Sequence, residues 1–184
     1  MSTGYSENSS LRRVQVIADF QFGGNCGTGL FPEGCTFIYS TTGRIRQVLF
    51  LGKRLATVRA SDGRLTLGIE GAKRLQTLLP PPGYRVVIRD DVAEFVAQGK
   101  NTFARHVIAA DPAIRAGDEV LVVAGTDILI ACGTAVISGE EMLAFNYGAA
   151  VKVRQGSENN ASGKYQPAPD EGDDEEARHE CRAD

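Results

Sequence analysis

Alternating apolar and polar positions predict short strands in the first half of the chain, separated by glycine-containing turns. Four strand candidates follow one another, at residues 36–40, 45–51, 55–60 and 64–69. The turns between them lie at 42–43, 52–53 and 62–63, and the last is an Asp-Gly pair, a strong hairpin signal. Leu65 and Leu67 share one face of their strand. The pattern predicts an antiparallel sheet with one side facing solvent.

The segments that flank this sheet carry different patterns. Residues 14–20 are rich in apolar side chains and predict a further strand. The glycine-rich stretch 23–29 matches neither G-x-G-x-x-G nor G-x-x-x-x-G-K-S/T, so a flexible turn is favoured over a phosphate-binding loop. Residues 70–79 predict a helix with an apolar inner face, which the prolines at 80–82 end. This stiff proline run marks the expected boundary between two domains.

The second half opens on a predicted strand, helix and loop. A β-branched run at 86–88 is typical of a strand. Two residue pairs have the spacing of a helix capping box, Asp91 with Glu94 and Ser138 with Glu141. The first predicts a helix with an apolar stripe formed by Val92, Phe95 and Val96. Gly99 can take the left-handed conformation that ends this helix.

The remaining pattern of the second half predicts three more strands. Two of them are buried, at 119–124 and 128–137. Gly133 indicates a bulge or a bend in the second. In the last strand, 149–154, two valines face one way, and Lys152 and Arg154 face the other. We therefore expect both cations to point to solvent.

Composition narrows the class of protein. A chain of 184 residues with 42% hydrophobic content can bury a core. It is too short for a (β/α)₈ barrel, which typically needs roughly 250 residues. It contains no run of about 18 apolar residues, and its polar start does not resemble a signal peptide. We expect a soluble, cytoplasmic protein that does not enter a membrane.

Cysteines and histidines offer no obvious catalytic or metal-binding cluster. The four cysteines contain no C-x-x-C pair, so neither a zinc site nor a cofactor is expected. A disulfide between Cys26 and Cys35 stays open, with free, buried thiols favoured. His106 lies in an apolar context and is expected to serve packing, and no carboxylate pair or activated nucleophile is evident.

Charge is divided unevenly along the chain. The net charge is -3, but nine acidic and three basic residues lie from Ser157 onward, a balance of -6 that leaves +3 for the rest. This acidic stretch has no apolar periodicity and is expected to be disordered. A mildly basic body with an acidic tail is typical of polyanion binders and also of many other proteins.

Two basic segments are candidates for binding. Residues 99–105 form a loop with cations, an amide and one aromatic ring, which suits a phosphate or an unpaired base but also an ordinary connection. A second set of cations clusters around the predicted hairpins: Arg44, Arg46, Lys53, Arg54, Arg59 and Arg64. A solvated face is the favoured interpretation of that set, with a nucleic-acid surface as the alternative.

An ordered series of motifs in the second half resembles a known family. The series runs D-D-x-A-E-F-V, G-K-N-T-F-A, D-P-x-I-R-x-G-D-E-V-L-V-V, A-C-G-T-A, S-x-E-E-M and A-V-K-V-R. It resembles the PUA domain, an RNA-binding pseudo-barrel, in the form found at the C-terminus of archaeal archaeosine tRNA-guanine transglycosylases. The preceding segment, with A-D-F-Q-F-G, T-G-R-I-R and R-A-S-D-G, is similar to the small domain before PUA in those enzymes.

The resemblance implies an α+β fold in two domains. A small antiparallel α+β domain is followed by a PUA-type β pseudo-barrel with short helices. The expected divisions are a polar tail at 1–10, the small domain at 11–80, the PUA domain at 84–155 and the acidic tail at 157–184. The catalytic barrel of the family has no counterpart in the sequence, so the chain is expected to be non-catalytic by itself.

The resemblance also implies an RNA groove. The glycine-containing loop after the first PUA helix supplies one wall and the final strand supplies the other, which gives Gly99, Lys100, Asn101, Phe103, Ala104, Arg105, Lys152, Val153 and Arg154. Phe103 is either a core residue, which is favoured, or a stacking platform. Arg44, Arg46 and Arg59 are expected to make auxiliary contacts.

The implied function is that of an accessory or detached subunit of a tRNA-modification system, which binds tRNA near its acceptor end. A separate catalytic subunit is an expected partner. The alternative is a protein-interaction or ribosome-assembly factor that uses the same basic surface.

Overall fold

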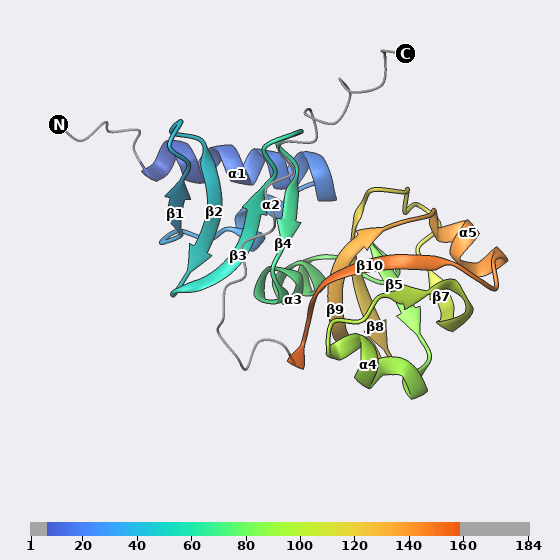
Figure 1. Cartoon of the computed structure of the whole chain (residues 1–184). Helices are drawn as coiled ribbons and strands as arrows, with labels where there is room; N and C mark the ends of the chain where they lie inside the picture. The colour runs from blue at the N-terminus through green and yellow to red at the C-terminus, as the bar shows by residue number, and fades with distance from the viewer. Residues whose placement is uncertain (1–6, 159–184) are drawn as a thin grey trace, which may run out of the picture.

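The protein has two β-sheets with helices packed around them. The computed structural model describes residues 7–158, so most of the predicted acidic tail lies outside the described residues. A four-stranded sheet occupies the first half and a six-stranded sheet the second, and α3 (Ile69–Leu78) lies between them (Figure 1). This is the α+β architecture expected from the sequence.

The first half contains the predicted hairpins. Its strands are β1 (Thr36–Tyr39), β2 (Ile45–Phe50), β3 (Lys53–Val58) and β4 (Leu65–Leu67). They pair in the order β1-β2-β3-β4, each antiparallel to the next. The predicted strands are therefore confirmed. The predicted helix at 70–79 is confirmed as α3, which begins one residue earlier.

The predicted strand at 14–20 is wrong, because this segment lies within α1 (Glu7–Phe22). The buried positions are Ser10, Val14, Ala18 and Phe22, which recur every four residues. This spacing places them on one face of a helix, whereas a strand would bury every second residue. The helix also includes residues 7–10, which the sequence had assigned to a polar tail.

The glycine-rich stretch is not simply a flexible turn, because α2 (Cys26–Leu30) forms within it. The Gly27 amide donates a hydrogen bond to the Asp19 carboxylate at 2.7 Å. A side chain at Gly27 would meet the backbone of Gln15 in α1. Glycine therefore allows the two helices to pack closely.

The second half forms the PUA-like pseudo-barrel. Its strands are β5 (Arg85–Ile88), β6 (Thr102–Phe103), β7 (Val107–Ala110), β8 (Glu119–Ala124), β9 (Ile128–Ala135) and β10 (Ala149–Gly156). They follow the order β6-β10-β9-β8-β5-β7, with β5 parallel to β8. The helices are α4 (Ala93–Ala97) and α5 (Gly139–Ala144), and 3₁₀ turns lie at Asp90–Val92 and Ala104–His106. The strands predicted in this half are confirmed.

One predicted capping box is present and the other is absent. Ser138 and Glu141 exchange both hydrogen bonds of the box at the start of α5. Asp91 instead accepts a hydrogen bond from the Arg89 guanidinium at 2.6 Å, and α4 begins after a 3₁₀ turn without a side-chain cap. Correct spacing alone therefore did not produce a cap, and the Asp91 carboxylate pairs with Arg89 instead.

Polar contacts and shared core packing join the two halves. Leu121, Val123 and Cys132 of the second half pack into the core cluster of the first. The Tyr84 hydroxyl donates to the Gln21 carbonyl at 2.7 Å. Arg64 forms an ion pair with Asp118 at 3.0 Å. The two halves are therefore held in a defined relation.

The three described cysteines are buried and free, which excludes the Cys26–Cys35 disulfide in this structure. We expect all three to resist alkylation in the folded protein. The Cys132 thiol donates to the Leu67 carbonyl, and burial raises its pKa to about 12, so the reactive thiolate is scarce at neutral pH. Peptide mass spectrometry after iodoacetamide treatment, with and without denaturant, measures this. Rapid labelling of Cys132 under native conditions would contradict it.

Candidate nucleic-acid interface

The loop that follows α4 and the final strand lie side by side. The Val153 amide donates to the Asn101 side-chain oxygen at 3.0 Å. Just beyond, β6 pairs antiparallel with β10, so that Thr102 faces Val151 and Phe103 faces Ala149. The structure thus brings together the two walls that the sequence placed 50 residues apart.

A close backbone approach holds one end of this arrangement. Gly99 has a φ of 91°, the left-handed conformation expected where α4 ends. A side chain at Gly156 would collide with the Ala97 carbonyl. Only a glycine lets the end of β10 pass so close to the end of α4, and the spacing between loop and strand depends on it. We call the surface formed by residues 99–105 and 152–153 the loop–strand groove, after the RNA groove that the family resemblance implies.

Lys100 and Lys152 provide the available positive charge of this groove. Both side chains are exposed, and neither forms an ion pair with another residue in the described range 7–158. Arg105 is exposed as well, and its guanidinium lies 5.8 Å from the centre of the Phe103 ring. Its Nε donates to His106 at 3.1 Å. Uncompensated cations of this kind suit phosphate groups.

Phe103 is not the core residue that the sequence favoured. Phe103 is 44% exposed, whereas its neighbours Thr102 and Ala104 are buried. Alternation along the short β6 strand explains the difference, because Thr102 faces inward and Phe103 outward. The ring is therefore accessible at the surface, and the Arg105 guanidinium lies over it in a cation–π contact.

Arg154 does not face solvent freely as predicted. The pairing of β10 with β9 shifts register between Val153 and Gln155, so Arg154 lies at a bulge. Its guanidinium pairs with both carboxylate oxygens of Glu119 and also donates to Thr134 at 2.8 Å. The bulge therefore turns Arg154 toward a buried partner and away from the groove.

The Glu119 carboxylate is the buried centre of this network. Its side chain is only 3% exposed, against 32% for Arg154, and it also accepts a hydrogen bond from the Leu67 amide at 2.9 Å. Burial raises the pKa of Glu119, and Arg154 offsets this only in part. Arg154 is thus a structural residue that links β8, β10 and the first sheet.

Ala104 and Val153 support the groove through their backbones. The Ala104 side chain is buried, and its amide donates to the Gly148 carbonyl at 3.0 Å. Val153 is half-buried, and its backbone amide donates the hydrogen bond that the Asn101 side-chain oxygen accepts. These two residues shape the groove but offer little side-chain surface for a ligand.

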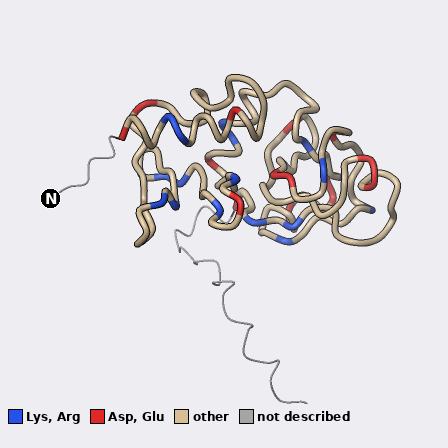
Figure 2. Tube along the Cα trace, turned by 90° about the horizontal axis from the view of Figure 1, so that it is seen from above, with Lys and Arg blue, Asp and Glu red and all other residues tan. Residues whose placement is uncertain are grey.

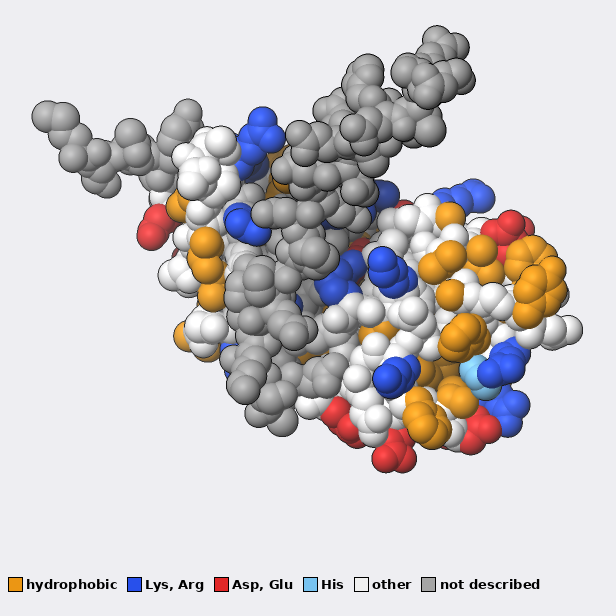
Figure 3. Space-filling view, in the orientation of Figure 1, with side chains coloured by type: hydrophobic (Ala, Val, Ile, Leu, Met, Phe, Trp, Pro, Cys, Tyr) orange, Lys and Arg blue, Asp and Glu red, His pale blue; other side chains and the backbone are white. Residues whose placement is uncertain are grey.

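The sequence interpretation missed an aromatic surface next to β10. Phe145 and Tyr147 stack with their ring centroids 6.3 Å apart, and Tyr147 is 81% exposed. Figure 3 shows apolar side chains gathered on this side of the second half, over α5 and the segment after it. The available signal was a pair of aromatic residues two positions apart, just beyond the end of α5 at Ala144.

The arginines predicted as auxiliary contacts lie in the first half. Lys and Arg positions recur along its hairpins (Figure 2). Arg44 and Arg46 are exposed, whereas Arg59 forms an ion pair with Asp62. Within residues 7–158, no group of three or more potential ligands could hold a metal ion. Across the same described range, no helix combines the length and apolar character needed to cross a membrane.

Family matches over both halves define the class of protein. Residues 84–156 match the PUA domain family, so the second half is a PUA domain. Residues 12–82 match the patch-forming domain C2 of tRNA-guanine transglycosylase. The chain therefore joins a domain of the C2 family to a PUA domain, and it corresponds to the C-terminal region of archaeal tRNA-guanine transglycosylases.

Full-length relatives are much longer than this chain. The tRNA-guanine(15) transglycosylase of Pyrococcus abyssi is 51% identical over 151 residues, which are 82% of this chain and 26% of the relative. The enzyme of the same name from Methanothermobacter thermautotrophicus is 43% identical over 147 residues, 79% of this chain and 22% of the relative. The chain spans about a quarter of the length of these curated relatives.

Solved structures confirm the fold. A hypothetical protein from Pyrococcus horikoshii has a TM-score of 0.65 at 20% identity, covering 82% of this chain and 92% of its own. A PUA domain protein from Thermoplasma acidophilum has a TM-score of 0.57 at 18% identity, covering 82% of this chain and 90% of its own. Both share the architecture of both halves.

Proposed function

We propose that this chain binds RNA through the loop–strand groove. The observation that carries the proposal is the hydrogen bond between Asn101 and the Val153 amide, which joins two walls that each present an exposed lysine without an ion pair among residues 7–158. Lysine side chains bind phosphates, while the exposed Phe103 ring offers a surface for an unpaired base. A fold of the PUA family supports the same conclusion.

The RNA we propose is tRNA, bound near its acceptor end. The support is the identity of up to 51% with tRNA-guanine(15) transglycosylases over most of the chain. Since the matched region excludes about three quarters of those enzymes, we propose an accessory role, with catalysis supplied by a separate subunit of a tRNA-modification system. In that role, the chain itself is non-catalytic and acts by positioning tRNA.

Binding of the purified chain to tRNA, titrated in salt, tests this proposal. We expect intact tRNA to bind more tightly than tRNA trimmed of its 3′ single strand, and more tightly than duplex RNA of similar length. The affinity should fall steeply with salt, because bound phosphates release their counterions. Equal affinity for tRNA and generic duplex would refute tRNA recognition, whereas equal affinity for intact and trimmed tRNA would refute only acceptor-end binding.

A second candidate function is binding to a protein partner. The exposed, stacked rings of Phe145 and Tyr147 favour it, because aromatic residues are enriched in protein interfaces. Co-purification of a defined partner from nuclease-treated lysate, lost on Phe145→Ser/Tyr147→Ser substitution, would support this candidate. Loss of tRNA binding in the same variant would instead assign the rings to RNA.

A further inference from the structure

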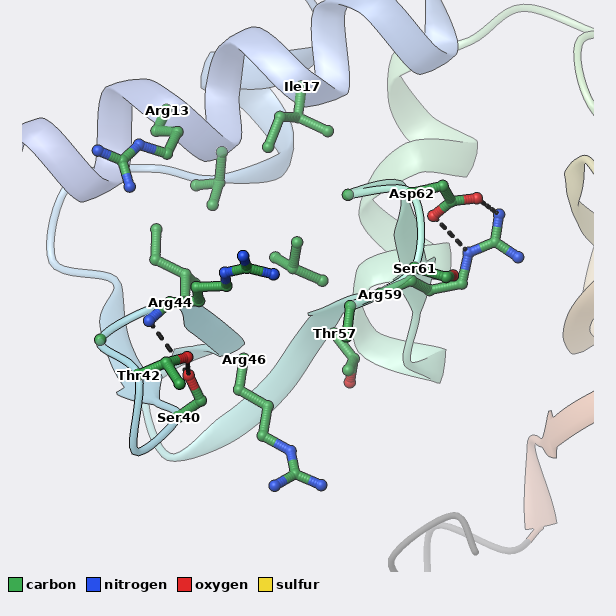
Figure 4. Close-up of a pocket in the computed structure, with 16 residues that line it drawn as sticks. Arg13, Ile17, Ser40, Thr42, Arg44, Arg46, Thr57, Arg59, Ser61 and Asp62 are labelled. Atoms are coloured by element: carbon green, nitrogen blue, oxygen red, sulfur yellow. Dashed lines mark hydrogen bonds and ion pairs between the residues drawn. The ribbon is translucent and has the colours of Figure 1, made fainter. Parts of the chain in front are cut away.

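A pocket lies in the first half, between α1 and the turns that join β1 to β2 and β3 to β4. Its volume is about 760 Å³, within the range of about 300–1,000 Å³ that is typical of small-molecule sites. Helix and strands supply an apolar wall, formed by Val14, Ile17, Ile45 and Val58. In Figure 4, Ile17 points from α1 toward the strands. The apolar surface that a ligand could reach there belongs mainly to Ile17 and Val58, because Val14 is fully buried and Ile45 is only 7% exposed.

Positive charge dominates the polar lining. Four arginines and one acidic residue, Asp62, line the pocket. Figure 4 shows Arg44 extending into the space between α1 and the strands, below Arg13, while Arg46 points away from α1. Arg59 is turned toward Asp62, with its Nε 3.1 Å from the carboxylate. Counted over the lining residues, four arginines against one aspartate give a formal charge of +3.

Local hydrogen bonds order the segment from which Arg44 extends. The Ser40 and Thr42 hydroxyls lie 2.9 Å apart, and the Arg44 amide donates to the Ser40 hydroxyl at 3.1 Å. The turn between β1 and β2 is therefore held in one conformation. An arginine on an ordered turn presents planar, paired donors that match the oxygens of a phosphate, at a reduced entropic cost.

We propose that this pocket binds a phosphate-bearing ligand of mononucleotide size. The phosphate lies against Arg44 and Arg13, and the base lies against the apolar wall beside Ile17. The shared chemistry has two sources, a free nucleotide or one unpaired nucleotide of a bound RNA. The pocket is separate from the loop–strand groove, and neither Lys100 nor Lys152 lines it.

Calorimetric titration of the full chain with adenosine 5′-monophosphate tests this site. Adenosine and inorganic phosphate are the matched probes, because each carries one half of the proposed ligand. We expect one nucleotide per chain, with each half-ligand bound at least tenfold more weakly. The Arg13→Gln/Arg44→Gln variant should lose at least tenfold in affinity for the nucleotide. Arg12→Gln/Lys53→Gln removes two charges outside the pocket and should retain the wild-type affinity.

A parallel titration with a single-stranded RNA pentamer distinguishes the two sources. If the pocket takes a nucleotide of RNA, the pentamer binds more tightly than the mononucleotide and loses affinity in Arg13→Gln/Arg44→Gln. If it takes a free nucleotide, the pentamer is unaffected by that variant. Equal nucleotide affinity in the wild type and in Arg13→Gln/Arg44→Gln, with the melting temperature preserved, would overturn the site. Because Lys100 and Lys152 stay intact throughout, failure here is distinct from failure of the groove.

Discussion

Substitution of Arg154 by alanine should lower the free energy of unfolding by about 3–5 kcal/mol, because removing one partner of a buried ion pair leaves the other uncompensated. Glu119 would remain almost fully buried, with the Leu67 amide as its hydrogen-bond donor and Arg59, which forms no ion pair with it, as the remaining cation that lowers its pKa. Denaturant unfolding followed by circular dichroism measures the loss. The Glu119→Gln/Arg154→Ala variant should recover part of it, since the buried charge is then absent.

A matched control shows whether the loss of stability is specific to the Arg154–Glu119 pair or would follow the loss of any ion pair between the two halves. Arg64 also connects them, through Asp118, but its side chain is 42% exposed. Arg64→Ala should therefore cost about 1 kcal/mol or less, because exposed ion pairs contribute little. A small stability loss in Arg154→Ala, combined with a large loss of RNA affinity, would contradict the structural role of Arg154.

The Arg154→Ala variant should also depend differently on pH. Burial raises the pKa of Glu119 in the folded protein above its unfolded value, and removal of Arg154 takes away the main influence that lowers it. The folded state then binds the proton more readily than the unfolded state, so stability rises as pH falls through the folded pKa. The variant should accordingly regain stability relative to wild type in mildly acidic solution, and unfolding at several pH values tests this.

Substitution of Lys100 and Lys152 by alanine should weaken tRNA binding by roughly 15- to 30-fold at about 0.15 M salt, because each lost phosphate contact removes the release of about 0.7–0.9 counterion. The fold should persist, since both side chains are exposed and form no ion pair within residues 7–158. The slope of log affinity against log salt should become shallower by about 1.4–1.8 for the pair.

The control for the lysine variant removes two charges elsewhere. Lys73 on α3 and Arg115 before β8 are both exposed and lie outside the loop–strand groove. Lys73→Ala/Arg115→Ala should change the affinity and the salt slope much less than the groove variant. Equal losses in the two variants would mean that binding follows net charge alone, and the groove would then have no specific role.

Local signals in the sequence were sufficient for most of the fold. Two of these signals are the alternation in the strands of the first sheet and the Ser138–Glu141 capping box. Each depends only on residues close together in the chain, so the folded structure retains both. The helix α1 was missed because its apolar residues are frequent enough to resemble a strand. The apolar positions Val14, Ala18 and Phe22 recur every four residues, and this spacing was the signal that could have identified the helix.

The candidate site depended more on distant partners. A glycine that ends a helix and a cation at an alternating strand position can be inferred locally, which explains why Gly99, Lys100 and Lys152 occupy the expected places. The direction of Arg154 could not be inferred, because a bulge and a buried Glu119 on another strand set it. Phe103 was misassigned for a related reason, since its exposure follows from the pairing of β6 at the edge of the sheet.

The sequence by itself determined the strands of the first sheet, the helix α3, the basic character of the body and the resemblance to a PUA domain, because these depend on residue type and spacing along the chain. Only the tertiary structure decided which cations are available to a ligand. In the folded chain, Arg154 pairs with Glu119, and Asn101 accepts a hydrogen bond from the Val153 amide. Arg44 lies opposite α1 across a pocket. Each outcome depends on partners far away in the sequence, whose proximity is created by folding.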